Sequence, residues 1–234
     1  MKRVVGMLVA SVALAGAAQA ADFSQGTAPG ATASGWNGFY AGVEGGYGWG
    51  QADFTPPSAG PASLNMNGGL LGVQAGFDFD LGNSIVVGLA GDTSWAAISG
   101  KTCVDSGGCS PPTSDDSYAN GNIDWLSTLR ARAGFTNSNV LFYGTGGLAY
   151  AHSNATITNV TATPDTWSAS AGAWGWVIGG GGEVKVSRHF SVGAEALYVD
   201  LGTTNYNFSG TGGSGTIPVK VTDSIVRAFM NYRF

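Results

Sequence analysis

The sequence has few charged residues, and its basic residues are outnumbered by acidic ones. Lys, Arg, Asp and Glu make up 11% of the 234 residues, whereas soluble proteins average about 25%. Ten basic residues stand against 15 acidic ones, so the formal net charge is −5. Nucleic-acid-binding domains usually carry a basic patch, so this composition argues against nucleic acid as a partner.

Residues suited to catalysis or to metal binding are also scarce. The chain has two histidines, His152 and His189, and no second ligand lies near either at a metal-binding spacing. The glycine-rich runs at 144–147 and 179–182 lack the lysine and the following helix of a phosphate-binding loop. We therefore expect a protein that is not an enzyme and that has no catalytic residue, cofactor or metal.

Only two cysteines are present, Cys103 and Cys109, in a polar stretch. In an oxidising compartment they are expected to pair and close a small loop, and two free thiols are the alternative. With no further cysteine and no nearby histidine, the spacing suits zinc poorly.

A long apolar run occurs only at the N-terminus. Lys2 and Arg3 precede an apolar stretch over residues 4–17, and Ala18-Gln-Ala20 follows it. This pattern predicts a secretory signal peptide over residues 1–20, with a membrane anchor as the alternative. Residues 21–35, rich in Ala, Ser, Thr, Gly and Pro, read as a flexible leader, and residues 36–234 as the folded domain.

Glycine is abundant, with 39 residues, and from Trp36 onward β-type segments alternate with turn-rich ones. We predict eight strands, at residues 38–53, 68–81, 84–98, 122–136, 139–153, 173–187, 189–202 and 222–234. Short connections alternate with long ones, and the long ones are residues 54–67, 99–121, 154–172 and 203–221. This layout predicts an all-β fold: an eight-stranded antiparallel up-and-down transmembrane β-barrel with four long extracellular loops and short periplasmic turns.

Alternation along the strands places charged residues on one face and apolar residues on the other. Successive side chains on a strand point to opposite faces, and in several strands the charged residues share the face opposite the apolar ones. We expect the charged face to line the barrel interior, as the residues Glu44, Asp78, Asp80, Asp92, Arg130, Arg132, Glu183, Lys185, Glu195, Arg227 and Arg233. Eight strands leave room for little more than side chains, so we expect ion pairs, with a charged pore lining as the alternative. The many glycines, including residues 179–182, should leave room for the arginine head groups.

The outward aromatic residues fall at two heights along the strands. The set on the side of the short turns includes Phe39, Phe77, Phe79, Phe135, Phe142 and Phe190. The set on the side of the long loops includes Trp49, Trp95, Trp125, Tyr150, Trp174 and Trp176. Two aromatic girdles around an apolar band are typical of a barrel that spans a bilayer. A soluble lipocalin-like carrier, the competing fold, needs neither the girdles nor an ionic interior.

Several motifs resemble a known family. They include Trp36-Asn-Gly-Phe-Tyr-Ala-Gly-Val-Glu44, Leu129-Arg-Ala-Arg-Ala-Gly-Phe135, Tyr143-Gly-Thr-Gly-Gly-Leu-Ala-Tyr150 and the terminal Tyr232-Arg-Phe234. As a set they resemble the small outer-membrane β-barrels of Gram-negative bacteria, the OmpA-like and opacity-type "porin family", in its alphaproteobacterial form. The resemblance implies a location in the cell outer membrane, among lipid and lipopolysaccharide. It also implies an assembly signal for the barrel-assembly machinery, formed by Phe234, Tyr232, Met230 and Ala228.

Three functions remain open at this level. A filled interior favours a structural, surface-exposed barrel, whereas the charged inner face would suit a narrow porin for ions or small solutes. The polar loops would suit an adhesin or a haemin-binding protein, because specificity in such folds resides in loops.

Overall fold

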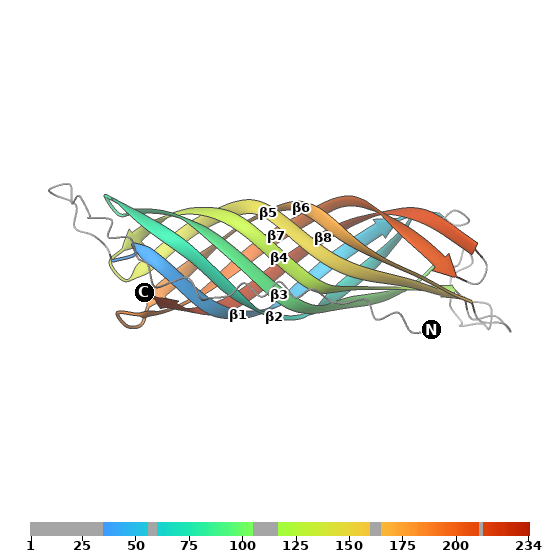
Figure 1. The fold of residues 1–234 in the computed structure, drawn as a ribbon, viewed down its shortest axis with the longest axis horizontal. Helices are drawn as coiled ribbons and strands as arrows, with labels where there is room; N and C mark the ends of the chain where they lie inside the picture. Colours follow the sequence, from blue (N-terminus) through green and yellow to red (C-terminus); the bar gives the residue numbers. More distant parts are fainter. Residues whose placement is uncertain (1–34, 56–59, 105–116, 160–164, 211–212) are drawn as a thin grey trace, which may run out of the picture. The chain divides into compact units, whose positions relative to one another are not determined.

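The computed structural model describes residues 35–55, 60–104, 117–159, 165–210 and 213–234. The predicted signal peptide and the leader up to residue 34 lie outside these residues. Eight antiparallel strands form one closed barrel in sequence order, in which β1 pairs with both β2 and β8 (Figure 1). The strands are β1 (Gly38–Phe54), β2 (Ala62–Gly82), β3 (Ile85–Cys103), β4 (Ser117–Asn137), β5 (Val140–Asn159), β6 (Asp165–Lys185), β7 (Phe190–Gly210) and β8 (Gly213–Arg233). The described residues contain no helix long and apolar enough to cross a membrane.

The predicted fold class is confirmed, and the short turns lie where the sequence placed them. Tight turns join β2 to β3, β4 to β5 and β6 to β7. Asn83, Ser84 and Ser138 adopt positive φ angles of 52°, 65° and 54° in the first two of these turns. We call this end of the barrel, which also holds the C-terminal Phe234, the turn end, and the opposite end the loop end.

The predicted loop boundaries are wrong, because the strands continue far into the four segments predicted as long loops. For example, β7 runs to Gly210 and β8 resumes at Gly213, although residues 203–221 were predicted to form a loop. In these extensions, outward side chains are mostly Asn, Ser, Thr and Gly, so the apolar alternation that marks a strand is lost. Strands of about 20 residues, tilted by about 40°, rise roughly 50 Å, well beyond an apolar band of about 25 Å.

Bulges near the loop-end aromatic residues also shift the alternation. In β4 the register shifts between Ile123 and Trp125, so Ile123, which regular alternation from the outward Trp125 would place outside, is buried inside the barrel. In β7 a shift follows Asp200, and Gly202 there has a φ of 64°. An extra residue in a strand exchanges its inward and outward faces. Beyond each of these bulges the strand continues, but the residues that alternation would place outward now point inward, and the reverse.

The barrel interior has two chemically distinct parts. Between the turn end and the middle of the barrel it is polar and ionic, with a small apolar cluster that includes Trp36 and Phe229. Toward the loop end it is apolar, and its buried members are Ala52, Leu64, Met66, Leu70, Ile98, Ile123, Leu126, Ala149, Ala151, Ala169, Ala173, Val177, Leu197, Val199, Leu201, Tyr206, Phe208, Ile217, Val219, Val221 and Ile225. The barrel is therefore filled by side chains over both parts.

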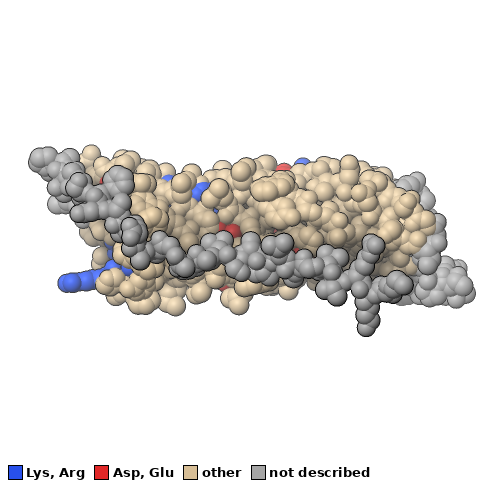
Figure 2. Space-filling view, in the orientation of Figure 1, with Lys and Arg blue, Asp and Glu red and all other residues tan. Residues whose placement is uncertain are grey.

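The outer surface is apolar where a soluble protein would be polar. Leu71, Leu129 and Leu148 are each more than half exposed, and uncharged residues cover most of the described surface in Figure 2. A soluble domain rarely exposes so large an apolar surface, whereas a bilayer favours it.

Candidate functional site

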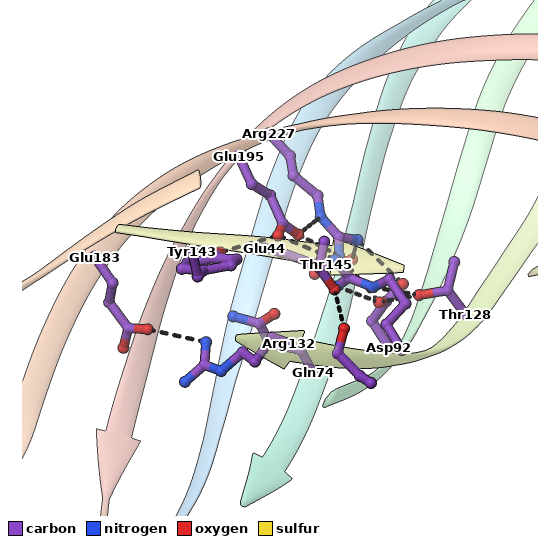
Figure 3. A network of polar contacts seen from close by, with 12 residues as sticks. Glu44, Gln74, Asp92, Thr128, Arg132, Tyr143, Thr145, Glu183, Glu195 and Arg227 are labelled. Carbon is purple, nitrogen blue, oxygen red and sulfur yellow. Dashed lines mark hydrogen bonds and ion pairs between the residues drawn. The ribbon is translucent and has the colours of Figure 1, made fainter. Parts of the chain in front are cut away.

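The charged part of the barrel interior is the candidate functional site. The buried polar side chains of the protein are concentrated there, and they come from all eight strands (Figure 3). Nine of the eleven charged residues predicted to line the interior are buried in it. They form two clusters of ion pairs, one nearer the turn end and one nearer the middle of the barrel.

The turn-end cluster consists of two arginines and two carboxylates, Asp78, Arg132, Glu183 and Arg233. Arg132 binds Asp78 through two of its nitrogens, with Nε at 2.7 Å from Oδ1, and reaches Glu183 at 3.2 Å. Arg233 binds the same two carboxylates, each at 2.9 Å. Each carboxylate thus bridges both guanidinium groups, and the charges balance within the cluster.

The central cluster has three carboxylates and two arginines, Glu44, Asp92, Glu195, Arg130 and Arg227. The Arg227 guanidinium contacts all three carboxylates, Glu195 at 2.6 Å and Asp92 at 3.0 and 3.1 Å. Arg130 donates to Asp92 at 2.8 Å and to Glu195 at 3.0 Å. Glu44 meets only Arg227 among the arginines, and its Oε2 has no hydrogen-bond partner in the described part of the chain. This cluster carries one more acid than base.

Neutral side chains complete the network. Ser94 donates to Glu44 at 2.7 Å, and the Tyr143 hydroxyl donates to Glu195 at 2.9 Å. Further donors to the carboxylates are Thr128, Ser191 and Asn231. These contacts offset part of the cost of removing the charges from water. They also leave the clusters densely cross-linked.

Gly179 and Gly181 of β6 make room for the close approach of β7, whose backbone and side-chain atoms lie nearest to them, and not, as we had predicted, for arginine head groups. A Cβ atom on Gly181 would lie 2.7 Å from the Cβ of Glu195, and one on Gly179 would lie 2.6 Å from a methyl group of Leu197. Real side chains do not approach so closely, so these positions require glycine while β7 keeps its position.

Two of the predicted charges lie outside the two clusters. Asp80 and Lys185 are half-buried near the turn end. The Asp80 carboxylate accepts a hydrogen bond from the Gly82 amide at 2.9 Å. The Lys185 ammonium lies 4.3 Å from the ring of Trp36, and the Arg233 guanidinium lies 4.5 Å from the same ring. Trp36 is fully buried and donates to the Ser138 carbonyl at 3.2 Å, so it closes the interior at this end.

Asp223 is a buried carboxylate that our sequence interpretation missed. It is 3% exposed, and its Oδ1 has no hydrogen-bond partner among the described residues. Asp223 lies four positions before Arg227 on β8, an even spacing that places both side chains on the inward face. This spacing could have identified Asp223 from the sequence. With Asp223 included, the described interior has six buried carboxylates and four buried arginines, so its buried acids outnumber its buried bases by two.

The predicted aromatic residues lie on the outer surface and contact one another between strands. At the turn end Phe39 and Phe77 lie 4.4 Å apart, measured between ring centroids. At the other height the pair Trp95 and Trp125 is 5.4 Å apart. The remaining predicted members, all exposed or half-buried, are Phe79, Phe135, Phe142, Phe190, Trp49, Tyr150, Trp174 and Trp176.

The four residues of the predicted assembly signal all face outward: Tyr232, Met230 and Ala228 on β8, and Phe234 directly after it. Phe234 is 78% exposed and contacts the ring of Tyr232, with 5.1 Å between the ring centroids. Their recognition by an assembly machinery stays a prediction.

Only one of the two cysteines of the predicted disulfide lies among the described residues. Cys103 ends β3, whereas Cys109 lies outside the described residues, so their pairing stays a prediction. His152 lies on the outer side of β5, with Nδ1 2.8 Å from the carboxylate of Asp124. Within the described ranges, no group of three or more His, Cys, Asp or Glu side chains is placed to hold a metal ion.

Beyond the loop-end aromatics the outer surface carries small polar networks. Asp53 accepts hydrogen bonds from the Ser63 hydroxyl at 2.6 Å and from the Gln51 amide at 2.7 Å. These two donors stabilise the charged form and hold the pKa of the Asp53 carboxyl below its usual range. The extension of the barrel is therefore polar outside and apolar inside.

An apolar exterior, two heights of outward aromatic residues and an ionic interior define an integral membrane β-barrel. The model of the family described as outer membrane protein beta-barrel domain matches residues 7–231. The chain belongs to this family and is a protein of the cell outer membrane.

Named relatives agree with this assignment. The chain is 30% identical over 211 residues to the 31 kDa outer-membrane immunogenic protein of Brucella melitensis, covering 85% of this chain and 84% of the relative. It is 29% identical over 181 residues to a 22 kDa outer membrane protein of Rhizobium leguminosarum, covering 77% and 71%.

Solved structures show the same fold at low sequence identity. The outer membrane protein OprG of Pseudomonas aeruginosa matches with a TM-score of 0.51 and 13% identity, covering 86% of this chain and 98% of OprG. The outer membrane protease OmpT of Escherichia coli matches with a TM-score of 0.53 and 8% identity, covering 89% and 99%. These likenesses concern the fold alone.

Proposed function

We propose that the protein is a structural, surface-exposed barrel of the outer membrane, that its interior does not conduct, and that it catalyses no reaction. The observation that carries this proposal is the stacking of two filled layers inside the barrel. The ionic clusters occupy the part nearer the periplasm, and the apolar side chains occupy the extracellular part.

Each layer opposes ion flow for its own physical reason. In the ionic layer every guanidinium group is bound to two or more carboxylates, so a passing ion would have to break buried ion pairs. In the apolar layer Leu197, Val199 and Ile225 are at most 3% exposed, and an ion there would lose its hydration without compensation. An ion would have to cross both barriers in series.

Single-channel recording tests this proposal. The purified chain, refolded and inserted into a planar bilayer, should give negligible conductance, with a conducting porin as the positive control. Steady channels of appreciable size would overturn the proposal.

A narrow pore is the alternative that the same recordings would identify. If current is observed, neutralising Arg130 and Arg132 by substitution with Gln should change its ion selectivity, because both guanidinium groups lie inside the barrel. Unchanged selectivity would exclude a pathway through the charged interior.

Surface exposure is the second part of the proposal. The strands extend well beyond the loop-end aromatic residues, and the outward side chains of this extension are polar. The Brucella relative is named an immunogenic protein, which is consistent with an exposed surface. We propose lipid and lipopolysaccharide as the partners of the apolar belt, and the barrel-assembly machinery as the partner of the C-terminal strand.

A host-surface or haemin ligand would have to bind at the extracellular end. Of the segment predicted as the loop 99–121, residues 99–103 and 117–121 belong to β3 and β4. A deletion should therefore remove only residues 105–116, with retained heat resistance of the barrel as the control for folding. Loss of binding to the candidate ligand would support a role for this segment, and unchanged binding would refute it.

A further inference from the structure

The extracellular half of the barrel interior contains an apolar cavity of about 50 Å³. Inward side chains of six strands, all except β3 and β6, line it, and the apolar ones are Ala52, Phe54, Leu64, Met66, Ala119, Ile123, Ala155, Ile157, Tyr206, Phe208, Ile217, Val219 and Val221. None of the described lining residues carries a charge. The cavity lies apart from both ionic clusters, none of whose members lines it.

Small side chains make up part of the cavity lining. Ala52, Ala119 and Ala155 contribute only methyl groups to it, beside larger side chains such as Tyr206 and Phe208. An eight-stranded barrel closes around a fixed diameter, so small side chains at one height leave space that the backbone does not close.

Three of the polar side chains around the cavity, Ser153, Asn154 and Tyr206, have hydrogen-bond partners. The hydroxyl groups of Ser153 and Tyr206 hydrogen-bond to each other. Asn154 donates to Asp124 at 3.1 Å and so makes its hydrogen bond on the outer side of the barrel. A buried water typically makes about three hydrogen bonds, and apolar cavities stay dry. This lining offers such bonds poorly, so an apolar occupant is favoured over water.

We propose that this cavity binds an uncharged, slender apolar molecule, such as the end of a linear aliphatic chain. Its volume exceeds the roughly 10–15 Å³ that a cavity needs to admit one water, and it is smaller than the roughly 150 Å³ of a cavity that holds benzene. A few methylene groups in a row fit this space, whereas an aromatic ring requires the lining to move. Binding would bury apolar surface of the ligand, which favours an apolar occupant.

Methyl NMR of the full barrel in lipid nanodiscs of dimyristoyl phosphatidylcholine tests the proposal, because no competing detergent is present. Ile123 and Ile217 line the cavity, whereas Ile178 is 55% exposed on the outer surface. With n-pentane as the probe, the methyl signals of Ile123 and Ile217 should shift and saturate. The Ile178 methyl should drift linearly with the amount of pentane in the lipid.

Matched variants locate the site. Ala119→Phe fills the cavity and should abolish the saturable shift at Ile217. Ala131→Phe places the same ring on the outward face of the same strand and should leave that shift unchanged. If Ala119→Phe does not fold, Ala52→Leu fills the cavity from β1 and should have the same effect.

Three outcomes would overturn the proposal. They are linear drift at all the isoleucine methyl groups, a saturable shift that persists in the filled variant, and benzene binding as tightly as n-pentane. The first two would exclude the cavity as the site, and the third would exclude a slender chain as the ligand class. None of these outcomes depends on whether the barrel conducts.

Discussion

Replacement of Arg227 by methionine should destabilise the barrel more than any other single loss of charge in the described interior. Arg227 contacts Glu44, Asp92 and Glu195 at once, and its side chain is 1% exposed. Methionine is unbranched and of similar length, so it fills much of the same space without the charge. The variant would leave Asp92 and Glu195 with Arg130 as their only guanidinium partner, and Glu44 with none.

The magnitude follows from the cost of buried charges. Removing one partner of a buried ion pair costs about 3–5 kcal/mol. Since Arg227 serves three carboxylates, we expect a loss near the upper limit, about 5 kcal/mol. At about 1.4 kcal/mol per factor of ten, this loss lowers the folding equilibrium constant by more than three orders of magnitude.

Glu44 provides an internal check, because its Oε2 has no hydrogen-bond partner in the described structure. Glu44→Gln alone should change stability little, since it removes the surplus acid of the central cluster. Combined with Arg227→Met, it should recover about 1–3 kcal/mol of the loss, within the usual range of coupling between neighbouring residues.

Urea titration of the barrel in lipid vesicles measures these effects, with tryptophan fluorescence and the heat-dependent shift in gel mobility as readouts. Arg188→Met is the matched control, because Arg188 is exposed at the turn between β6 and β7. A loss below about 1 kcal/mol for Arg227→Met, or an equal loss for Arg188→Met, would refute the reasoning that the network holds the barrel together.

Three further predictions use the same urea assay. Asp223→Leu should stabilise the barrel by about 1–3 kcal/mol, because it removes a buried carboxylate with an unpaired oxygen; destabilisation would show that the carboxylate has a partner. Leu129→Arg, on the outward face between the two heights of aromatic residues, should cost about 2–4 kcal/mol, whereas Ser168→Arg in the extracellular extension should cost at most about 1 kcal/mol; equal costs would contradict the assigned position of the bilayer. Trp36→Ala should cost about 3–5 kcal/mol, because its fully buried indole packs under two cations; a loss below 1 kcal/mol would show that the periplasmic end closes without it.

Much of the candidate site could be predicted from alternation alone. Between the two heights of aromatic residues, a strand has one face toward lipid and one toward the interior, so parity assigns each side chain. Glu44, Asp92 and Glu195 were placed inside the barrel on this basis, and they are buried there. Parity also accounts for Asp223, although our sequence interpretation overlooked it.

Outside the bilayer, alternation no longer tells which face of a strand points inward. The difference between apolar and polar outward residues is lost there, and bulges exchange the inward and outward positions. The bulges near Ile123 and Gly202 exchange the two faces of a strand, and nothing local in the sequence marks them. Beyond them the outward residues are polar, so the extensions of β3, β4, β7 and β8 resemble loops in sequence. The apolar cavity lies in this region, and its lining could not be assembled from the sequence.

The sequence by itself determined the closed eight-stranded barrel, the two chemically distinct faces of its strands and its location in the outer membrane. These features follow from period-two patterning against a fixed bilayer thickness, which acts residue by residue along the chain. Only the tertiary structure decided which carboxylate meets which arginine, how far the strands continue beyond the membrane, and where the interior leaves a cavity. The reason is that these outcomes depend on the stagger between strands and on closure of β1 against β8, which bring together residues far apart in the sequence, such as Glu44 and Arg227, 183 positions apart.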